Sequence, residues 1–411
     1  MSTPSVLLIP DLLKAGKLYS QIPNSGAVDF DVTRATTAYR TNASGILESV
    51  ASGVPRLDYP IGGGCPSLLV EPAATNLALR SEEFDNASWA KTRSSVTQNA
   101  TTAPNGTTTA DKLIASVDNN THFILQSSIV VVAQIYSASI FAKKGEYDTI
   151  RLRMVNLWSP TPTAVYNLTS KTIVSTASST AKITELSDGW FRLDLSATAN
   201  AIAGSNAQLE VLVGNNSVLS FAGDGTSGIF IWGAQLEVGS VATSYIPTVA
   251  ATATRNADVI SKTGVSGFIG QTQGTLYAEV DLRNFLTSNV RIFGVSDGTA
   301  TNRIILLTNS ANRITLIISN GGVESAQIST PTLTAGVYKI AVGYAVNDFV
   351  LYVNGAQIGT DTIGSVPACS AVFLGKVETS SSSAFLNDRI RAAAIYPTRL
   401  TNSQLSSLTT L

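Results

Sequence analysis

Charged residues are scarce in this chain of 411 residues. Only 13% of them are Asp, Glu, Lys or Arg, which is about half the usual share for a soluble domain. The formal net charge is −1, and no cluster of Lys and Arg stands out in the sequence. Nucleic acids and anionic membranes attract basic clusters, so neither is an expected partner. A low charge content also suits surfaces that become buried between subunits.

Histidine and cysteine are nearly absent, with one and two residues respectively. His122 alone cannot build a histidine-based metal site, and most mechanisms that use a histidine as general base are excluded as well. We expect it to be an ordinary strand residue. Cys65 and Cys369 lie far apart and form no Cys-x-x-Cys pair. Two buried thiols are therefore expected rather than a disulfide framework.

Long apolar runs are missing too. The stretch Ser5–Pro10 (SVLLIP) is too short for the apolar region of a signal peptide and has no basic residues before it. No uninterrupted apolar run approaches the length of a membrane-spanning helix. We expect a protein that is made in the cytoplasm and keeps its N-terminus, which fits a virion component better than an exported adhesin.

Proline and glycine break up the first part of the chain, residues 1–78. Leu12–Tyr19 is compatible with one short helix, but the residues after it are interrupted too often for regular structure. Apolar stretches such as Leu7–Leu13 and Ser67–Val70 would be exposed if this segment stood alone. We therefore expect an irregular docking segment that lies against the next domain, a sister subunit or another virion protein.

The rest of the chain has the pattern of an all-β protein. Short runs alternate apolar and polar residues, as in Thr275–Leu282, and turn residues such as Asn354-Gly355 separate them. We expect one β-sandwich over residues 79–248, a connector over 249–270 and a second β-sandwich over 271–411. The last residues can form one short helix that begins at Thr401 or Asn402.

Two segments of the last domain resemble concanavalin A-like, laminin-G-like lectin domains. Tyr338–Thr360 (YKIAVGYAVNDFVLYVNGAQIGT) is similar to the central hairpin of that family, in which a strand runs into Asn-Gly. Asn387–Ser407 (NDRIRAAAIYPTRLTNSQLSS) is similar to its closing strand and short helix. The resemblance covers about residues 265–411 and implies a lectin-like jelly roll.

A second resemblance covers more of the chain. It is to a module found in tailed-bacteriophage virion proteins, whose middle domain is similar to carbohydrate-binding-module jelly rolls. The segments that carry it are VTRATTAY from Val32, SGVPRLDY from Ser52, CPSLLVEPAATN from Cys65, SEEFDNASW from Ser81, TTTADKL from Thr107, DGWFR from Asp188 and IWGAQLEVGSVATSYIP from Ile231. This resemblance implies a tail, fibre or head-appendage protein, without saying where on the particle it lies.

Catalytic motifs are incomplete. Glu279-x-Asp281 begins the carboxylate pattern of jelly-roll β-glucanases, but Leu282, Arg283 and Asn284 follow where the second catalytic carboxylate belongs. Retaining hydrolysis needs two carboxyl groups about 5–5.5 Å apart. Gly294–Gly298 fits the bare Gly-x-Ser-x-Gly spacing, but no histidine follows it in the chain. We expect no catalytic residues and no enzymatic activity.

Glycan binding would need an exposed aromatic ring with amides or carboxylates beside it. Trp158 is the best aromatic candidate because it lies outside any alternating run, and Asn347 and Asn387 lie on expected loops. Asp297 and Asp388 are candidate ligands for Ca²⁺, and we expect no other cofactor. No spacing matches a dedicated calcium loop, however, and ordinary turns explain the same residues.

Together these features predict a structural component of a bacteriophage virion that adheres to glycans on the host surface. Residues 1–78 would contact other virion proteins, and the chain would form a homo-oligomer, with a trimer as one candidate. Two alternatives stay open: a polysaccharide depolymerase with a glucanase-like jelly roll, and a bacterial surface adhesin.

Overall fold

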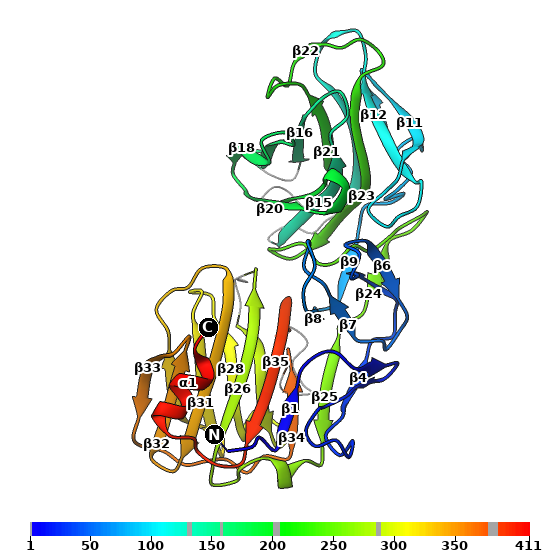
Figure 1. Cartoon of the computed structure of the whole chain (residues 1–411). Coiled ribbons are helices and arrows are strands. Elements are labelled where there is room, and N and C mark those ends of the chain that lie inside the picture. The colour runs from blue at the N-terminus through cyan, green and yellow to red at the C-terminus, as the bar shows by residue number, and fades with distance from the viewer. Residues whose placement is uncertain (1, 130–133, 157–158, 200–205, 285–288, 377–384) are drawn as a thin grey trace.

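Alternating apolar and polar residues fold into antiparallel strands along nearly the whole chain. The structure is a computed structural model and describes residues 2–129, 134–156, 159–199, 206–284, 289–376 and 385–411. Its strands form two β-sandwiches, one above the other, and the N-terminal segment runs beside the lower sandwich and through the junction (Figure 1). The predicted all-β fold class with two sandwiches is confirmed.

The middle sandwich packs two six-stranded sheets around one apolar core. One sheet has the order β10 (Ala90–Thr92), β14 (His122–Ile129), β21 (Asn206–Gly214), β16 (Thr149–Val155), β17 (Thr163–Asn167) and β18 (Thr172–Ala177). The other has the order β11 (Ser94–Thr101), β12 (Ala110–Ala115), β23 (Gly228–Val238), β15 (Ile135–Lys143), β20 (Trp190–Thr198) and β19 (Thr180–Glu185). A short pair, β13 (Asn119–Asn120) with β22 (Phe221–Ala222), lies at one end.

In β20, every second residue faces the core. Phe191, Leu193 and Leu195 belong to the core cluster, whereas Arg192 and Asp194 point to the outer face of the sheet. That outer face is the one turned toward the junction with the second sandwich.

The C-terminal sandwich is larger and takes strands from both ends of the chain. Its first sheet has the order β33 (Ala356–Asp361), β32 (Asp348–Val353), β31 (Gly336–Ala345), β26 (Gln273–Leu282), β35 (Asp388–Tyr396), β8 (Ser67–Val70) and β7 (Arg56–Asp58), and β1 (Val6–Leu8) also pairs with β35. Its second sheet has the order β2 (Leu13–Lys14), β3 (Lys17–Leu18), β4 (Phe30–Thr33), β25 (Val259–Thr263), β34 (Ala371–Leu374), β27 (Val290–Ser296), β28 (Arg303–Thr308), β29 (Ile314–Asn320) and β30 (Val323–Ser329).

The elements predicted for residues 271–411 agree with the structure. In β26, Leu276, Ala278, Val280 and Leu282 face the core as their alternation predicts. Helix α1 (Asn402–Thr409) begins after Thr401, whose side chain accepts the Gln404 N–H in a capping box.

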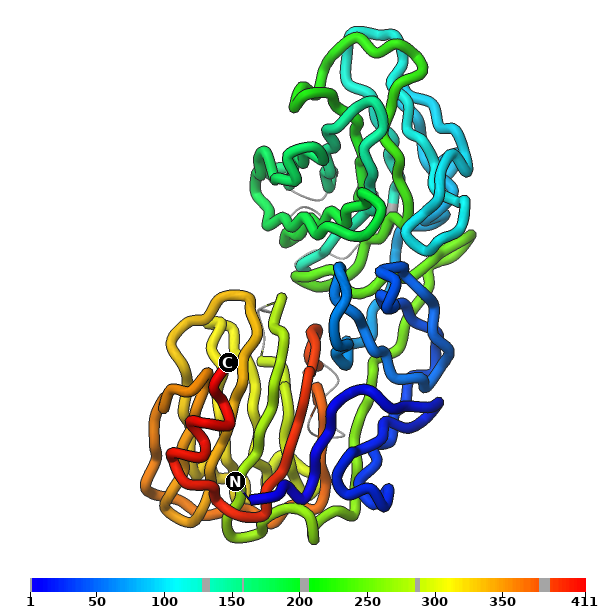
Figure 2. The backbone as a smooth tube through the Cα atoms, viewed as in Figure 1, coloured from blue at the N-terminus to red at the C-terminus, as the bar shows by residue number. Residues whose placement is uncertain are grey.

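The N-terminal segment is not irregular, and the helix expected over Leu12–Tyr19 is absent. Gly16, with φ of +80°, turns the chain between β2 and β3, a conformation that favours glycine. The strands of this segment are only two to four residues long, so they show no clear alternation of their own. Some of them pair with each other, as β2 does with β3, and others pair with distant strands, as in Val6 with Ile395. Figure 2 shows the N-terminal trace running alongside the C-terminal strand.

The expected connector, residues 249–270, also contains strands. β24 (Ala253–Arg255) pairs with β9 (Ala74–Asn76), and β25 lies inside the second sheet of the C-terminal sandwich. The hairpin of β5 (Ala38–Thr41) and β6 (Leu47–Val50) covers the outer face of the middle sandwich, where Trp190 and Trp232 are buried. The junction is therefore built by two passes of the chain.

The single histidine and the two cysteines lie in different environments. His122 lies in β14 and its two ring nitrogens bond the backbone oxygens of Arg93 and Phe221, at 2.7 and 2.9 Å. Cys369 is buried, but Cys65 is exposed after three glycines, so the expectation of two buried thiols was wrong for Cys65. Among the described residues no helix is long and apolar enough to cross a membrane.

Candidate functional site

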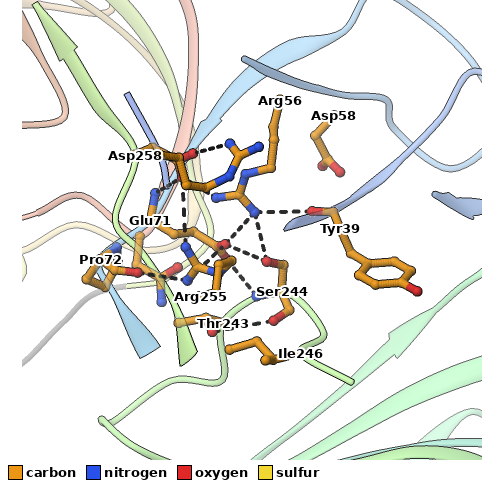
Figure 3. A network of polar contacts seen from close by, with 12 residues as sticks. Tyr39, Arg56, Asp58, Glu71, Pro72, Thr243, Ser244, Ile246, Arg255 and Asp258 are labelled. Carbon is orange, nitrogen blue, oxygen red and sulfur yellow. Dashed lines mark hydrogen bonds and ion pairs between the residues drawn. The ribbon is translucent and has the colours of Figure 1, made fainter. Parts of the chain in front are cut away.

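Five buried charged side chains meet where the two sandwiches join. Three arginines and two carboxylates form this charge network, whose side chains are at most 4% exposed: Arg34, Arg56, Glu71, Arg255 and Asp258. Figure 3 shows Arg56 between the carboxylates of Glu71 and Asp258. Arg56 also donates to Ser244 Oγ at 2.8 Å, which ties the network to the segment that leaves the middle sandwich.

Both carboxylates of the network are ion-paired with arginines. Burial alone would raise the pKa of Glu71, but the positive charges of Arg56 and Arg255 outweigh that effect and hold this pKa well below its usual range. Ser244 N–H donates to the same carboxylate at 2.7 Å. We infer a structural role for the charge network, because the carboxylate oxygens of Glu71 and Asp258 already accept bonds from groups inside the protein.

A cavity of about 380 Å³ lies beside the charge network, between the two sandwiches. Its walls come from β19, β20 and residues 240–245 of the middle sandwich, from residues 39–41 and 58–61 of the N-terminal segment, and from Arg283, Asn284, Asn387 and Arg389 of the C-terminal sandwich. We call it the inter-sandwich cavity. Its volume falls in the range of about 300–1,000 Å³ typical of small-molecule sites.

Asp194 is the most distinctive group in this cavity. Its side chain is 15% exposed, and its Oδ1 is buried without a hydrogen bond among the described residues. Arg192 Nε lies 3.3 Å from that oxygen but also lacks a hydrogen bond, while the same guanidinium donates to Ser139 Oγ at 2.9 Å. Burial raises the pKa of Asp194, although Arg192 and Lys182 counteract the shift. The carboxylate is therefore held in place with accepting capacity unused.

Two further groups in the cavity wall have unused hydrogen-bonding capacity in the described part of the chain. Tyr59 is half-buried, Asn387 is buried, and neither the Tyr59 hydroxyl nor the Asn387 side-chain amide has a hydrogen-bond partner among the described residues. The backbone oxygen of Asn387 accepts a bond from Asn284 Nδ2 at 3.0 Å, which fixes the loop. Tyr39 adds a second aromatic ring, stacked edge-to-face on Tyr245 with centroids 5.4 Å apart.

The other carboxylates near the cavity are already engaged. Asp58 accepts bonds from Arg389 Nε at 2.6 Å and Thr41 N–H at 2.8 Å. Glu185 pairs with Lys171 at 2.6 Å. On the outer face of β26, Glu279 pairs with Arg391 at 3.1 Å. None of these is a free partner for Asp194 in a two-carboxylate mechanism.

The sequence-predicted site residues are scattered. Trp158 lies outside the described residues. Asn387 contributes to the cavity wall, as a glycan-binding residue would, but Asn347 lies in the β31–β32 turn at the other end of the sandwich, where its Oδ1 accepts the Gly364 N–H at 2.9 Å. Asn387 and Asn347 lie at opposite ends of β26. The Leu282 end of this strand lies near Asn387, and its Gln273 end pairs with Ala345, close to Asn347.

The two candidate calcium ligands also lie at opposite ends of the C-terminal sandwich. Asp388 accepts backbone N–H bonds just beyond Leu282, whereas Asp297 follows β27 near the start of β26. Ten residues of β26 span roughly 30 Å, so these carboxylates cannot share one ion. Asp297 instead accepts bonds from Thr299 and Asn302 within its turn. Among the described residues no group of three or more His, Cys, Asp or Glu could hold a metal.

Asp388 gives a test of electrostatics at the edge of the cavity. Burial raises the pKa of Asp388 to about 7, against about 3.9 in an unfolded chain. Its stabilising contribution is therefore complete only below about pH 4, the unfolded-state pKa, and is lost progressively as the pH rises from there through about 7. We expect the unfolding free energy of the wild type to fall relative to that of Asp388→Asn by roughly 2–4 kcal/mol between pH 5 and pH 8. Denaturant unfolding at a series of pH values measures this, and parallel curves for the two proteins would contradict it.

A comparison with protein-family models identifies a relative of the C-terminal sandwich. Residues 254–406 match the family model of the concanavalin A-like lectin/glucanases superfamily. This agrees with the lectin-like jelly roll that the sequence resemblance implies for that part of the chain. A search of curated protein sequences gives no match.

Several solved structures resemble parts of the chain at low identity. The CBM40 module of the Ruminococcus gnavus IT-sialidase, bound to α2,3-sialyllactose, is 17% identical, covers 36% of this chain and 91% of that chain, and has a TM-score of 0.30. Domain 4 of the GH43 arabinanase AbnA from Geobacillus stearothermophilus, in complex with arabinotriose, is 16% identical, with 41% and 82% covered and a TM-score of 0.31. The SAP-like pentraxin from Limulus polyphemus is 17% identical, with 33% and 68% covered and a TM-score of 0.26.

Sequence reasoning missed Asp194 and Tyr59. Asp194 looks like an ordinary outward residue of an alternating strand, and Tyr59 ends a segment that the resemblance to phage proteins had already picked out, SGVPRLDY. A carboxylate between apolar residues, two positions after an arginine, was the available signal in β20. Nothing in the sequence indicated that these residues face one cavity.

Proposed function

We propose that this chain is a non-catalytic, glycan-binding structural protein of a bacteriophage particle, and that the inter-sandwich cavity holds the sugar. One observation carries the binding part: Asp194, Asn387 and Tyr59 line one cavity with hydrogen-bonding capacity that no described residue uses. Sugars present hydroxyl groups that both donate and accept, together with apolar ring faces that pack on aromatic side chains. A carboxylate, an amide and a tyrosine are suitable partners for such a ligand.

The lack of catalysis is part of the proposal. Asp58, Glu185 and Glu279 are each ion-paired, and Asp388 accepts the backbone N–H groups of Arg283 and Asn284, so these carboxylates are already engaged. Retaining and inverting hydrolysis both use a pair of carboxyl groups. The engaged state of these side chains supports adhesion over depolymerisation.

The virion role is supported by the sequence segments that resemble tailed-phage proteins. Three side chains of the charge network, Arg34, Arg56 and Glu71, come from those segments. In this proposal the protein is located on the particle as a symmetric oligomer, contacts other virion proteins, needs no cofactor, and gains useful attachment from many weak sites acting together.

Asp194→Asn should weaken glycan binding without unfolding the protein. The substitution keeps the shape of the side chain but removes its charge, and a hydrogen bond to a charged group contributes about 1.5–3 kcal/mol. We expect roughly a 10- to 100-fold loss of affinity per site. The wild type, presented as a multimer, is first screened on a glycan array, and the best ligand is then titrated against both proteins.

Glu185→Gln is the matched control, because Glu185 also borders the cavity but is exposed and pairs with Lys171. It should bind like the wild type, and both variants should keep the wild-type melting temperature. The same incubations should release no new reducing ends. Failure of the multimer to bind any glycan, or equal affinity of Asp194→Asn and wild type, would refute the proposed site.

A further inference from the structure

The cavity wall contains five basic side chains, and four of them have a carboxylate partner: Arg40 with Glu48, Arg192 with Asp194, Arg283 with Asp281 and Arg389 with Asp58. Lys182, in β19, is the exception. Among the described residues, no carboxylate lies within 4 Å of its ammonium group. Its ammonium group donates to the neutral Asn284 Oδ1 at 3.2 Å, across the junction between the two sandwiches.

Lys182 as a whole residue is exposed, but its surroundings in the cavity wall still disfavour its positive charge. Desolvation lowers the pKa of Lys182, and repulsion from Arg389 and Arg283 lowers it further, while Asp194 and Asp388 act in the opposite direction but do not compensate. Each of those two arginines is neutralised by its own carboxylate, Asp58 or Asp281. The one positive charge of the cavity wall that has no carboxylate partner among the described residues is therefore that of Lys182, where an incoming anion would find a donor with unused N–H groups.

Lys182 also stands close to the groups proposed to hold the sugar. It lies on the strand next to β20, directly across the ladder from Asp194. Asn284, its hydrogen-bond partner, bonds in turn to the backbone of Asn387. A ligand in contact with Asp194 and Asn387 would thus bring its neighbouring substituents to the ammonium group of Lys182.

From this arrangement we infer that the inter-sandwich cavity selects acidic glycans, with the anionic group of one sugar bound at Lys182 and the hydroxyls of the same or the next sugar bound at Asp194 and Asn387. This inference rests on the proposed function and specifies its ligand. A carboxylate, a phosphate ester or a sulfate ester provides the same chemistry at a lysine, which acts as a point charge. Lys182 is then the residue that determines the specificity of the site.

The test uses the full chain, presented as a multimer, on an array of acidic and neutral oligosaccharides. Each acidic glycan that binds is compared with a neutralised copy, prepared by carboxyl reduction for carboxylates or by ester cleavage for phosphates and sulfates. We expect neutralisation to weaken wild-type binding at least tenfold and added salt to weaken binding of the acidic form. The two kinds of neutralisation identify which anion the site takes.

Two variants each remove one positive charge. Lys182→Gln should bind the acidic glycan and its neutralised copy within about twofold of each other. Lys171→Gln is the matched control, because Lys171 is an exposed lysine that pairs with Glu185 and is not part of the cavity wall. This variant should keep the wild-type preference.

The outcomes separate the two proposals. Glycans that bind equally well before and after neutralisation, or a Lys182→Gln variant with an unchanged preference, would overturn the selection of acidic sugars and leave glycan binding intact. A multimer that binds no glycan of either kind would overturn the proposed function itself, and this inference with it.

Discussion

Deletion of residues 1–78 should unfold the C-terminal sandwich instead of removing a separate docking arm. Strands β1, β7 and β8 belong to one of its sheets, and β2, β3 and β4 to the other. The segment contributes eight apolar side chains to the core of that sandwich, each at most 3% exposed: Val6, Leu8, Leu18, Val28, Phe30, Val32, Leu68 and Val70. Burial of one such side chain is worth about 1.5–3 kcal/mol, and the net stability of a domain is only about 5–15 kcal/mol.

The deletion can be followed by size-exclusion chromatography, near-UV circular dichroism and limited proteolysis. We expect aggregation, or a chain in which residues 254–406 are cleaved rapidly, because β35 would become an unpaired edge beside an open core. A soluble product that keeps a cooperative C-terminal melting transition at the wild-type temperature would contradict this. It would also restore the separate docking segment that the sequence suggested.

A pair of substitutions tests the same point without removing any residue. Leu8 is fully buried in the core of the C-terminal sandwich, whereas Leu12, four residues later, is 60% exposed. Leu8→Asp should therefore reproduce the effect of the deletion, because it places a charge in an apolar core. Leu12→Asp should leave the melting temperature nearly unchanged.

The sequence predicted the sandwiches far better than the N-terminal segment, for a physical reason. A strand such as β26 is ten residues long, so its alternation identifies the inner face before any partner is known. Strand β1 has three residues, and its partners in β35 lie nearly four hundred positions away. Local patterns carry no information on such pairings. The apolar stretches did indicate burial, but they could not distinguish the chain's own core from another protein.

The candidate site was harder still to predict. Asn387 was found because polar loop residues are common ligands, and the structure places it in the wall of the cavity. Asp194 and Lys182 reach the same cavity from adjacent strands, and Tyr59 reaches it from the end of β7. Only the packing of one sandwich against the other brings these groups together. Any role in particle assembly must also rely on the exposed residues of the N-terminal segment, since its apolar strands are buried in its own chain.

Arg56→Met should be the most destabilising single substitution in the junction. Arg56 is fully buried and pairs with both Glu71 and Asp258. Without Arg56, Glu71 keeps only the longer contact with Arg255 at 3.4 Å, and Asp258 keeps Arg34 at 2.8 Å. Breaking a buried ion pair by removing one partner costs up to about 3–5 kcal/mol. Arg56→Lys should recover only part of this loss, because a single ammonium group cannot match the two contacts of the guanidinium. Denaturant unfolding measures each change.

Arg40→Met is the matched control. Arg40 lies in β5 and pairs with Glu48 at 2.9 Å, but the side chains are 19% and 36% exposed. Solvent screens such pairs, so we expect a loss of less than about 1 kcal/mol. Equal destabilisation by Arg40→Met and Arg56→Met would contradict a special role for the buried network.

A second substitution at Glu71 shows whether the effect of Arg56→Met arises from unbalanced charge. Glu71→Gln removes the carboxylate that loses its shorter ion pair in Arg56→Met, so the double variant should be less destabilised than the sum of the single variants. The pH dependence gives an independent check. Because the folded-state pKa of Glu71 is held below its unfolded value of about 4.3, the stabilisation by Glu71 is present at neutral pH and is lost as the pH falls below about 4. Glu71→Gln should therefore lose less stability than the wild type between pH 6 and pH 3, and additive effects together with parallel acid profiles would show that the network contributes packing alone.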